Sequence, residues 1–412
     1  MREMKDSGVE WIGEIPVNWE LSKIGSVYDE RNEKVSDKDF APLSVTKQGI
    51  VPQLETAAKT DNGDNRKLIR KNDFVINSRS DRRGSCGISE YEGSCSLINT
   101  VLKPQTNMCN RYYGFVFKSD SFADEYYRWG HGIVDDLWST KWIDMKSIYI
   151  PAPNIAEQER IADYLDTKCS KIDEIIEKQQ AIIEKLKEYK LSVISEIVTK
   201  GLNRNVEMKD SQDDFVGEIP YHWEMLKFGR CISVKSNLVP PDDYKDYPQI
   251  SPDCIEKGAA RLVGHKTVEE SGVISWNHLF FKGQIIYSKI RPLLDKVVIA
   301  PFDGLCSADM YPIETSNNPK FVVYMMLSAY FHSQVALVTE NRVKMPKINQ
   351  NELTNITVVM PPMEEQKEIV EWLDRKCHEI DKNISARELL IEKYSKYKKS
   401  LIYEVVTGKK EV

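Results

Sequence analysis

The chain has 412 residues, of which 41% are hydrophobic, and a formal net charge of −6. No apolar run reaches the length of about 18 residues that a transmembrane helix requires, and the charged start of the chain lacks the apolar core of an export signal. The eight cysteines form no CxxC pair and no cluster with histidine, so we predict no metal site and no disulfide scaffold, and we expect a cytoplasmic location. The acidic balance argues against general coating of polyanions but leaves room for a local basic patch.

The first stretch, residues 1–153, reads as a globular α/β domain. Strand-like runs bounded by Gly, Pro or Asn are predicted at 41–51, 73–79 and 96–104, followed by a helix at 112–130. The stretch closes on a short helical piece and a strand that ends in prolines at 153. Asn154 and Glu157 then have the spacing of a capping box, which predicts the start of a helix.

Residues 154–203 read as one long helix, because apolar residues recur at coiled-coil spacing. Leu165, Ile172, Leu186 and Val193 form one row, and Cys169, Ile176, Ile183 and Ile197 form the second. The cysteine is expected to serve there as a small apolar filler. With a rise of ~1.5 Å per residue, such a helix is long enough to act as a spacer.

The second half of the chain repeats the first. EQERIADYLDTKCSKID at 157–173 recurs as EQKEIVEWLDRKCHEID at 365–381, and MKDSGVEWIGEIPVNWE at 4–20 recurs as MKDSQDDFVGEIPYHWE at 208–224. A second globular domain at 204–361 and a second long helix at 362–412 are therefore predicted. The ends of the repeat are alike and its middle differs. This suggests two domains that are attached to the long helices in the same way but have different binding properties.

Catalytic motifs are missing from the sequence. It has no glycine-rich cofactor loop with an Asn-Pro-Pro-aromatic motif, as a DNA methyltransferase would need, and no phosphate-binding GxxxxGK[ST] loop. The acids of PDDYK at 241–245 are too crowded for a nuclease site and read as a turn. We therefore predict no catalytic residue and no cofactor on this chain.

The repeated strings resemble the specificity (S) subunit of type I restriction-modification systems over essentially the whole chain: IGEIPxxWE or VGEIPxxWE opens each globular stretch, and EQxxI and LDxKxxxID follow on each long helix. The resemblance implies an α+β fold, with two α/β target-recognition domains and two long helices in an antiparallel coiled coil. It further implies that each domain reads one half of a bipartite double-stranded DNA site. The helices would set the gap and dock two modification subunits.

Restriction subunits would join in the full complex. S-adenosylmethionine, ATP and Mg would bind to those partner subunits, which would supply adenine-N6 methylation and ATP-dependent cleavage.

Candidate DNA contacts come from local basic runs within this acidic chain. Between Arg66 and Arg83 there are seven basic residues and two acids, and the run NRVKMPK at 341–347 contains no acid. Guanidinium and ammonium groups in such loops bind phosphates or guanine edges. The candidates are Arg79, Arg82, Arg83, Lys47, Gln48, Lys289, Arg291, Arg342, Lys344 and Lys347. The alternative for each run is a solvated loop.

A third apolar row beside the two coiled-coil rows predicts where partner subunits dock. A two-helix pair needs only its two inner rows, so additional apolar residues require another cover. The row consists of Ile161, Ile175, Ile182, Tyr189, Ile369, Leu390 and Tyr397. A non-catalytic scaffold, with duplicated helices that join other proteins, remains the alternative function.

Overall fold

The computed structural model describes residues 2–53, 63–132, 138–340, 342 and 346–412. The chain divides into two compact units. Unit 1 contains residues 1–180 and 388–412, and unit 2 contains residues 181–387. Each unit therefore combines one globular domain with a segment of both long helices, α4 (Ile155–Lys200) and α9 (Met363–Val406).

In its described residues, the globular part of unit 1 has more strand than helix, with three short α-helices. Its elements are β1 (Met4–Asp6), β2 (Glu14–Pro16), β3 (Glu20–Lys23), β4 (Tyr28–Glu30), β5 (Lys34–Val35), β6 (Leu43–Thr46), β7 (Gly49–Pro52), β8 (Arg66–Ile69), β9 (Phe74–Asn77), β10 (Cys86–Ile88), β11 (Gly93–Cys95), β12 (Asn99–Pro104), α1 (Asn110–Lys118), α2 (Asp120–Arg128), α3 (Trp142–Met145) and β13 (Tyr149–Ala152). The helix predicted at 112–130 is two helices, because Ser119 ends α1 in an extended conformation and caps α2.

The sheets of unit 1 are small. A four-stranded sheet has the order β10-β9-β12-β4, and a three-stranded sheet has the order β11-β8-β5. The hairpin of β6 and β7 lies across both, and an isolated parallel bridge joins Pro42 to Ser94 at its start. β13 pairs with β3, which joins the two ends of the domain before α4 begins.

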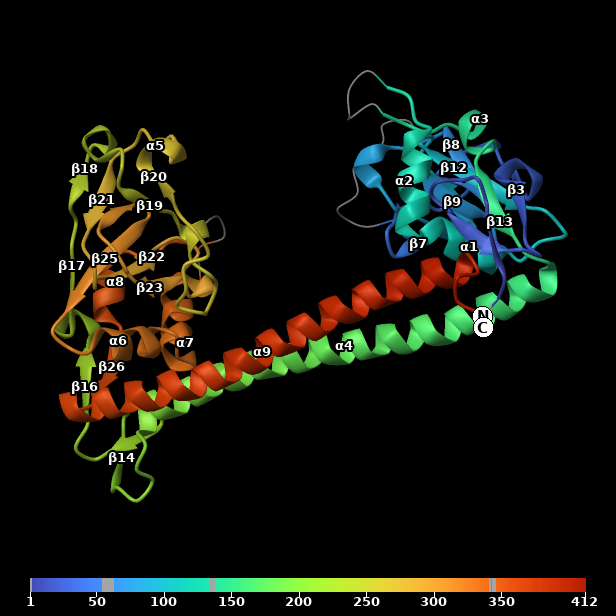
Figure 1. Ribbon diagram of the computed structural model, residues 1–412. Helices are drawn as coiled ribbons and strands as arrows, with labels where there is room; N and C mark the ends of the chain where they lie inside the picture. The colour runs from blue at the N-terminus through green and yellow to red at the C-terminus, as the bar shows by residue number, and fades with distance from the viewer. Residues whose placement is uncertain (1, 54–62, 133–137, 341, 343–345) are drawn as a thin grey trace. The chain divides into compact units, whose positions relative to one another are not determined.

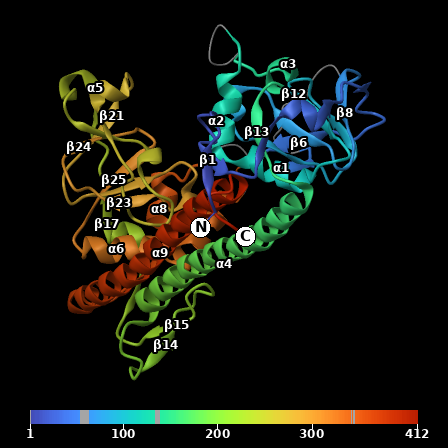
Figure 2. The same cartoon turned by 45° about the vertical axis from the view of Figure 1, so that its right-hand side comes forward.

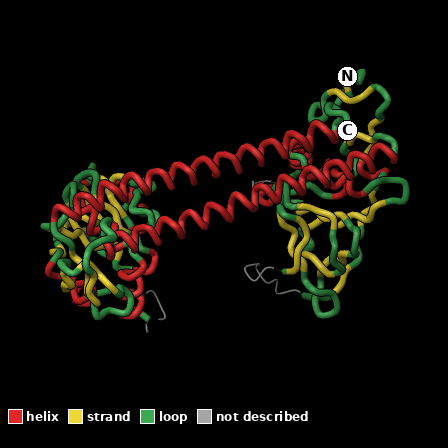
Figure 3. The backbone as a smooth tube through the Cα atoms, turned by 90° about the horizontal axis from the view of Figure 1, so that it is seen from below, coloured by secondary structure: helices red, strands yellow, loops and turns green. Residues whose placement is uncertain are grey.

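The core of unit 1 includes the far end of the chain. Leu401, Ile402, Val405 and Val406 of α9 are buried in the same cluster as Trp19, Tyr112 and Phe117. The Tyr112 hydroxyl donates a hydrogen bond to the carbonyl oxygen of Val406 at 2.9 Å, across 294 positions of sequence. Figure 3 shows the N- and C-termini side by side in this unit, and Arg2 forms an ion pair with Glu411 at 3.4 Å.

Unit 2 repeats this arrangement with a larger second sheet. Its elements are β14 (Met208–Asp210), β15 (Glu218–Pro220), β16 (Glu224–Lys227), β17 (Ile232–Val234), β18 (Leu238–Val239), β19 (Pro248–Ile250), β20 (Lys266–Thr267), α5 (Val268–Ser271), β21 (Asn277–Phe280), β22 (Ile285–Ser288), β23 (Val297–Ile299), β24 (Gly304–Cys306), β25 (Met310–Thr315), α6 (Pro319–Met326), α7 (Ala329–Thr339), α8 (Gln350–Asn355) and β26 (Thr357–Met360). The predicted turn at 241–245 is a 3-10 helix, Pro241–Tyr244.

The strand orders of unit 2 match those of unit 1. The sheet β17-β25-β22-β23 corresponds to β4-β12-β9-β10, and β18-β21-β24 corresponds to β5-β8-β11. In unit 2 the second sheet continues through β19, which is parallel to β24, and then β20. Figures 1 and 2 both show the β14–β15 hairpin on the other side of the helix segments from these sheets.

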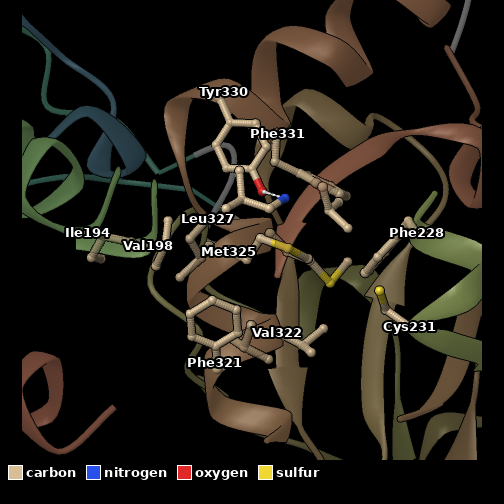
Figure 4. Close-up of a cluster of buried hydrophobic side chains, with 14 of the residues drawn as sticks. Ile194, Val198, Phe228, Cys231, Phe321, Val322, Met325, Leu327, Tyr330 and Phe331 are labelled. Atoms are coloured by element: carbon tan, nitrogen blue, oxygen red, sulfur yellow. Dashed lines mark hydrogen bonds between the residues drawn. The ribbon is translucent and has the colours of Figure 1, made fainter. Parts of the chain in front are cut away.

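The core of unit 2 is built from α6 and α7 together with the end of α4. Ile194 and Val198 of α4 lie in the same buried cluster as Phe228, Phe321 and Phe331 (Figure 4). The backbone N–H of Val359 in β26 donates to the Tyr330 hydroxyl at 3.3 Å, so this buried oxygen has a partner inside the core. The start of α9 contributes to this cluster as well, which makes each core depend on both long helices.

Both long helices begin one residue after their predicted starts at 154 and 362, but α4 ends at Lys200 and α9 at Val406, before the predicted limits at 203 and 412. The Asn154 side chain accepts from the Glu157 N–H at 3.0 Å, and Gly201 follows α4 with a left-handed φ of 73°. The other half of the predicted capping box is not formed, because the Glu157 carboxylate lies 2.5 Å from Arg2.

A buried glutamine connects each long helix to its domain. The amide oxygen of Gln158 accepts from the Cys109 N–H at 2.9 Å, and its amide nitrogen donates to the Pro153 carbonyl at 2.8 Å. Gln366 makes the same two bonds in unit 2, with the N–H of Asn318 and the carbonyl of Pro361, both at 2.9 Å. This accounts for the glutamine of the repeated EQ string.

The seam between the helices is apolar, with ion pairs at equivalent places in the two repeats. Lys190 lies 2.8 Å from Asp381 in unit 2, and Lys398 lies 2.6 Å from Asp173 in unit 1. Charged pairs that fit only one alignment fix the register of a coiled coil. Cys169 and Cys377 are buried in the seam, and burial raises the pKa of both thiols, as expected for apolar fillers.

Among the residues that the structure describes, no individual helix has both the length and the apolarity to cross a membrane; α6 and α7 meet these criteria only as a pair, with a bend of 60° between them.

Candidate nucleic-acid interface

In unit 1, the segment after β9 lies against the segment before α3. The N–H of Ser80 donates to the Trp138 carbonyl at 3.2 Å, and the N–H of Thr140 donates to the Ser78 carbonyl at 3.0 Å. The segment after β11 joins them, since the N–H of Ser78 donates to the Ile98 carbonyl at 3.1 Å. We call the segments 47–48, 78–83 and 138–140 the loop edge of unit 1.

Unit 2 forms the same contacts at the equivalent positions. The N–H of Arg291 donates to the Pro346 carbonyl at 2.8 Å, and the N–H of Ile348 donates to the Lys289 carbonyl at 2.9 Å. The segment after β24 joins them, because the N–H of Lys289 donates to the Asp309 carbonyl at 3.0 Å. We call the segments 251–253, 289–296, 307–309 and 346–348 the loop edge of unit 2.

The arginines predicted to contact DNA in unit 1 differ in their surroundings. Arg79 is exposed beside the bridge to Ser139, and the Arg82 side chain is 68% exposed on a 3-10 turn, Ser80–Arg82. Arg83 is half-exposed and paired with Asp124. Arg66, which the sequence places in the same basic run, is buried with its Nε bonded to Ser94 at 2.8 Å and does not face solvent.

Lys47 and Gln48 lie at the tip of the β6–β7 hairpin and are both exposed. The adjoining Gly49 approaches Gly87 of β10 so closely that a Cβ on Gly87 would lie 3.0 Å from its Cα. The parallel bridge between Pro42 and Ser94 shows that β6 runs in the same direction as β11. The C-terminal end of β6 therefore lies on the same side as the segment that follows β11, which is the side of the loop edge. In unit 2, β19 is parallel to β24, so Ser251 after β19 occupies the corresponding place.

Lys289 and Arg291 follow the C-terminal end of β22 in unit 2. The Lys289 ammonium lies 5.3 Å from the centroid of the Tyr311 ring, and Arg291 is exposed with a left-handed φ of 45°. A positive φ is uncommon for a residue other than glycine and occurs where the surroundings hold the backbone. The structure brings the backbone of these two residues together with the 346–348 segment.

Arg342 and Lys347 are less available than their sequence run indicates. The Arg342 guanidinium bonds to Glu352 and to the carbonyl oxygen of Lys347, and the Lys347 ammonium lies 2.9 Å from Asp309. The absence of acids within the run does not leave these side chains unpaired, because the fold brings acids from other segments. Lys344 lies outside the described residues.

A histidine holds the loop that follows Arg291. The Nδ1 atom of His332 on α7 lies 2.8 and 2.9 Å from the two carboxylate oxygens of Asp295. The hydrogen bond to Asp295 raises the pKa of the His332 imidazole. Asp295 also has a left-handed φ, of 47°, so this contact helps to fix a strained turn at the loop edge.

The loop edge of unit 2 also carries a groove of about 630 Å³ that sequence reasoning did not identify. Gln249, Ser251, His265 and Lys266 supply polar groups to it, and Val273 supplies an apolar wall. These residues come from segments whose proximity depends on strand pairing, for which the sequence has no local signal. No group of three or more His, Cys, Asp or Glu suited to a metal ion occurs in the described ranges.

The predicted docking row on the helices is only partly exposed. Ile161 and Ile369 are 2% and 1% exposed and belong to the cores of units 1 and 2, so their assignment to a partner surface is wrong. Both lie where a helix crosses its own domain, which already covers this face. The remaining members are half-buried or exposed: Ile175, Ile182, Tyr189, Leu390 and Tyr397.

Comparison with known families identifies the class of protein. Residues 16–188 and 223–387 each match the family described as the type I restriction modification DNA specificity domain. The two matches cover both globular domains and most of both long helices, and the chain belongs to this family.

Relatives within the family bear corresponding names. The chain is 34% identical over 247 residues to the type I restriction enzyme EcoDI specificity subunit of Escherichia coli, a match that covers 56% of this chain and 55% of that protein. This chain thus spans about half the length of that relative. It is 25% identical over 423 residues to the type I restriction enzyme MjaVIII specificity subunit of Methanocaldococcus jannaschii, covering 96% of this chain and 93% of that one.

Solved structures support the fold. A chain from a structure that describes complex assembly and conformational transition of the type I R-M system aligns with a TM-score of 0.70 at 12% identity, covering 95% of this chain and 98% of that chain. The HsdS subunit from Thermoanaerobacter tengcongensis aligns with a TM-score of 0.50 at 14% identity, over 96% and 98% of the two chains. The predicted fold, a tandem of mixed α and β domains with long helices, is confirmed.

Proposed function

We propose that this chain is the DNA-recognition subunit of a type I restriction-modification complex, with each loop edge reading one half of a bipartite site. The observation that carries the proposal is that both units hold two loop segments together by the same backbone hydrogen bonds while presenting different side chains. A common frame with different polar groups suits two sites that read different base sequences.

The chain itself is proposed to be non-catalytic. Two modification subunits would bind the helices and methylate adenines, and restriction subunits would complete the assembly with ATP-driven cleavage. S-adenosylmethionine, ATP and Mg would bind to those subunits. The family membership and the missing catalytic motifs support this division of labour.

The most direct experiment is to sequence methylated adenines in cells that carry this chain with its modification subunit. We expect one motif made of two defined half-sites with unspecified bases between them. In vitro, the assembled complex should shift a duplex containing that motif, with an affinity that falls as salt rises. A methylation pattern independent of this chain would contradict the proposal.

The alternative function, a scaffold that joins other proteins through its helices, makes a different prediction. Such a chain would assemble its partners equally well without changing their choice of DNA sequence. The exposed Arg79 and Arg82 on one loop edge, and the exposed Arg291 with the half-buried Lys289 on the other, favour DNA recognition.

Substitutions at the loop edges should separate the two half-sites. We expect Arg79→Ala with Arg82→Ala to weaken or relax recognition of one half-site, and Lys289→Ala with Arg291→Ala to do so for the other. Each lost bidentate contact with a base should cost ~1–3 kcal/mol, whereas a lost phosphate contact should lower the affinity for all sequences alike. Affinities for duplexes randomised in one half-site at a time measure the difference.

The matched control is Arg111→Ala. Arg111 is also a half-exposed arginine of unit 1, but it pairs with Asp163 and Asp166 at the start of α4, away from the loop edge. It should leave both half-sites unchanged. Equal losses on both half-sites from either pair of substitutions would rule out the assignment.

The length of the helices should set the gap between the half-sites. α4 has 46 residues, so it is ~69 Å long at ~1.5 Å per residue. An insertion near its C-terminal end is unsuitable, because Val198 is fully buried and Gly201 packs against Trp223 in the core of unit 2. Duplicating one heptad in each helix, residues 174–180 in α4 and 381–387 in α9, keeps the apolar rows aligned.

Seven residues add ~10 Å of helix, which corresponds to about three base pairs at ~3.4 Å each. We expect the methylated motif to keep both half-sites and to gain about that many unspecified base pairs. The control is a heptad duplicated in one helix only, which disrupts the pairing of the seam and should abolish methylation. An active variant with the original gap would show that the helices do not set the spacing.

A further inference from the structure

Two large apolar side chains stand exposed on one loop of unit 2. The Ile274 side chain is 93% exposed and that of Trp276 is 58% exposed, between α5 and β21. Single exposed apolar residues are common, but an almost fully exposed isoleucine next to an exposed tryptophan forms an apolar tip. No side chain in the described part of unit 2 covers this tip.

The loop that carries this tip is fixed at both ends. Before it, Thr267 and Glu270 form a reciprocal capping box on α5, and Gly272 ends that helix with a φ of 63°. After it, the Asn277 amide donates to the Ser275 carbonyl at 2.9 Å and accepts from the Gln249 amide at 3.3 Å. Asn277 and Gln249 are both buried. Hydrogen bonds at both ends of the loop thus hold the tip in place, so that it does not fold back onto the core.

The tip lies at the loop edge of unit 2. β21 begins directly after Trp276, and its second residue, His278, is paired with Cys306, the last residue of β24. Cys306 leads into the 307–309 segment, where Asp309 accepts from the N–H of Lys289. Val273, beside Ile274, lines the same groove as Ser251 and Lys266. Figure 1 shows α5 and β20, which lead into the loop, at the end of unit 2 away from its helix segments.

We propose that Ile274 and Trp276 form a wedge that inserts between neighbouring base pairs of the half-site bound by unit 2 or of its immediate flank. Apolar side chains that enter a base step unstack it partially and bend the duplex, which brings more of the protein into contact with the phosphates. Lys266 beside the tip is exposed and placed for such a phosphate contact. Of the two acids on α5, Glu270 already accepts from the N–H of Thr267 at 2.9 Å.

DNA is favoured over a protein partner because the tip shares its edge with Lys289, Arg291 and the polar groove, whereas the exposed apolar row for partner subunits lies on the helices. The inference rests on the proposed function, since it requires that unit 2 bind duplex DNA. It adds a deformation of the DNA to the contacts already argued.

The experiment uses the full chain, assembled with its modification subunits, and duplexes with 2-aminopurine at successive adenine positions across the half-site and its flanks. DNA methyltransferases flip their target base out of the stack, so a rise in fluorescence is expected at the methylated adenines in any case. We expect one further rise on binding, at the base step where the wedge reduces stacking. Ile274→Ser with Trp276→Ser should remove that rise and lower the affinity about tenfold, or ~1.4 kcal/mol. Because no phosphate contact is lost, the slope of affinity against salt should be unchanged.

Two further variants make the result specific. Lys266→Ala should keep the fluorescence rise and reduce the salt slope by about one. Phe281→Ser removes an exposed aromatic residue, 47% exposed, at the other end of β21 and should change neither readout.

If the complex binds its site with no fluorescence rise other than at the methylated adenines, the wedge is wrong and the proposed function stands. If the double substitution reduces binding of the modification subunit and not of DNA, the tip is a protein-docking surface and the inference is overturned. If the complex shows no sequence preference at all, the proposed function fails and the wedge with it.

Discussion

Replacing Ile182 and Leu390 together by glutamate is expected to abolish co-purification with the modification subunits while the chain itself remains folded. Ile182 is half-buried on α4 and Leu390 is 37% exposed on α9, in the row that includes the exposed Tyr189 and Tyr397. A partner that covers this row would bury two unpaired carboxylates, at a cost of ~3–5 kcal/mol each. That is enough to dissociate an interface at ordinary concentrations.

The measurement is affinity purification of the tagged chain with the modification subunit expressed beside it, together with a thermal unfolding curve of each variant. The control is Leu191→Glu, a leucine of α4 that is 38% exposed and lies nine residues from Ile182, on the opposite face of the helix. This variant should assemble normally. If the double variant assembles as well, the row does not dock modification subunits.

A second large effect is expected at the other end of the sequence. Leu401→Ala should destabilise unit 1 by ~2–5 kcal/mol, although the residue lies far along the chain from the domain that it supports. Leu401 is 1% exposed in the core of unit 1, and the next turn of the helix is fixed there by the Tyr112 bond to Val406 and by a bond at 3.2 Å from the Tyr403 hydroxyl to the Ile12 carbonyl. The cavity left by the missing side chain lies inside that packed region.

Hydrogen exchange resolved by peptide distinguishes the two units in one experiment. Peptides from 1–153 should exchange faster in the variant, and peptides from 209–361 should be unchanged. Recognition of the half-site assigned to unit 1 should fail first on warming. Leu389→Ala, at a leucine of the same helix that is 51% exposed, should have little effect on either unit. Faster exchange confined to unit 2 would contradict the division of the chain.

The sequence predicts the helices well because their periodicity is local, and the recurrence of the same pattern 208 positions later removes ambiguity. It fails where a face of a helix is covered by its own domain. Ile161 and Ile369 have the same spacing as Ile182, and nothing in the spacing tells which part of a long helix crosses a folded domain. The region predicted as one helix shows a similar limit. Ser119 is the N-cap of α2 in the structure, but a serine within a helical pattern does not by itself show that one helix ends and another begins.

The candidate interface was predictable to the extent that it rests on runs of residues. Lys289 and Arg291 were found because they belong to a local basic run, but the neutralisation of Lys347 by Asp309 depends on a contact across 38 positions. Nothing in the sequence indicated that Ile274 and Trp276 are exposed at the interface. In a sequence an apolar pair before a strand reads as core, and only the pairing of β21 with β24 shows that it points away from it.

The buried glutamines at the start of α4 and α9 have a mechanical consequence. Each ties its helix to two backbone groups of the adjoining domain through both ends of one amide, and each is surrounded by protein, so that water does not compete for the bonds. A joint of this kind is stiff. We therefore expect a force on the loops of one domain to bend its helix and not to rotate the domain about the start of that helix. Elastic deformation of the chain would then occur in the helices themselves.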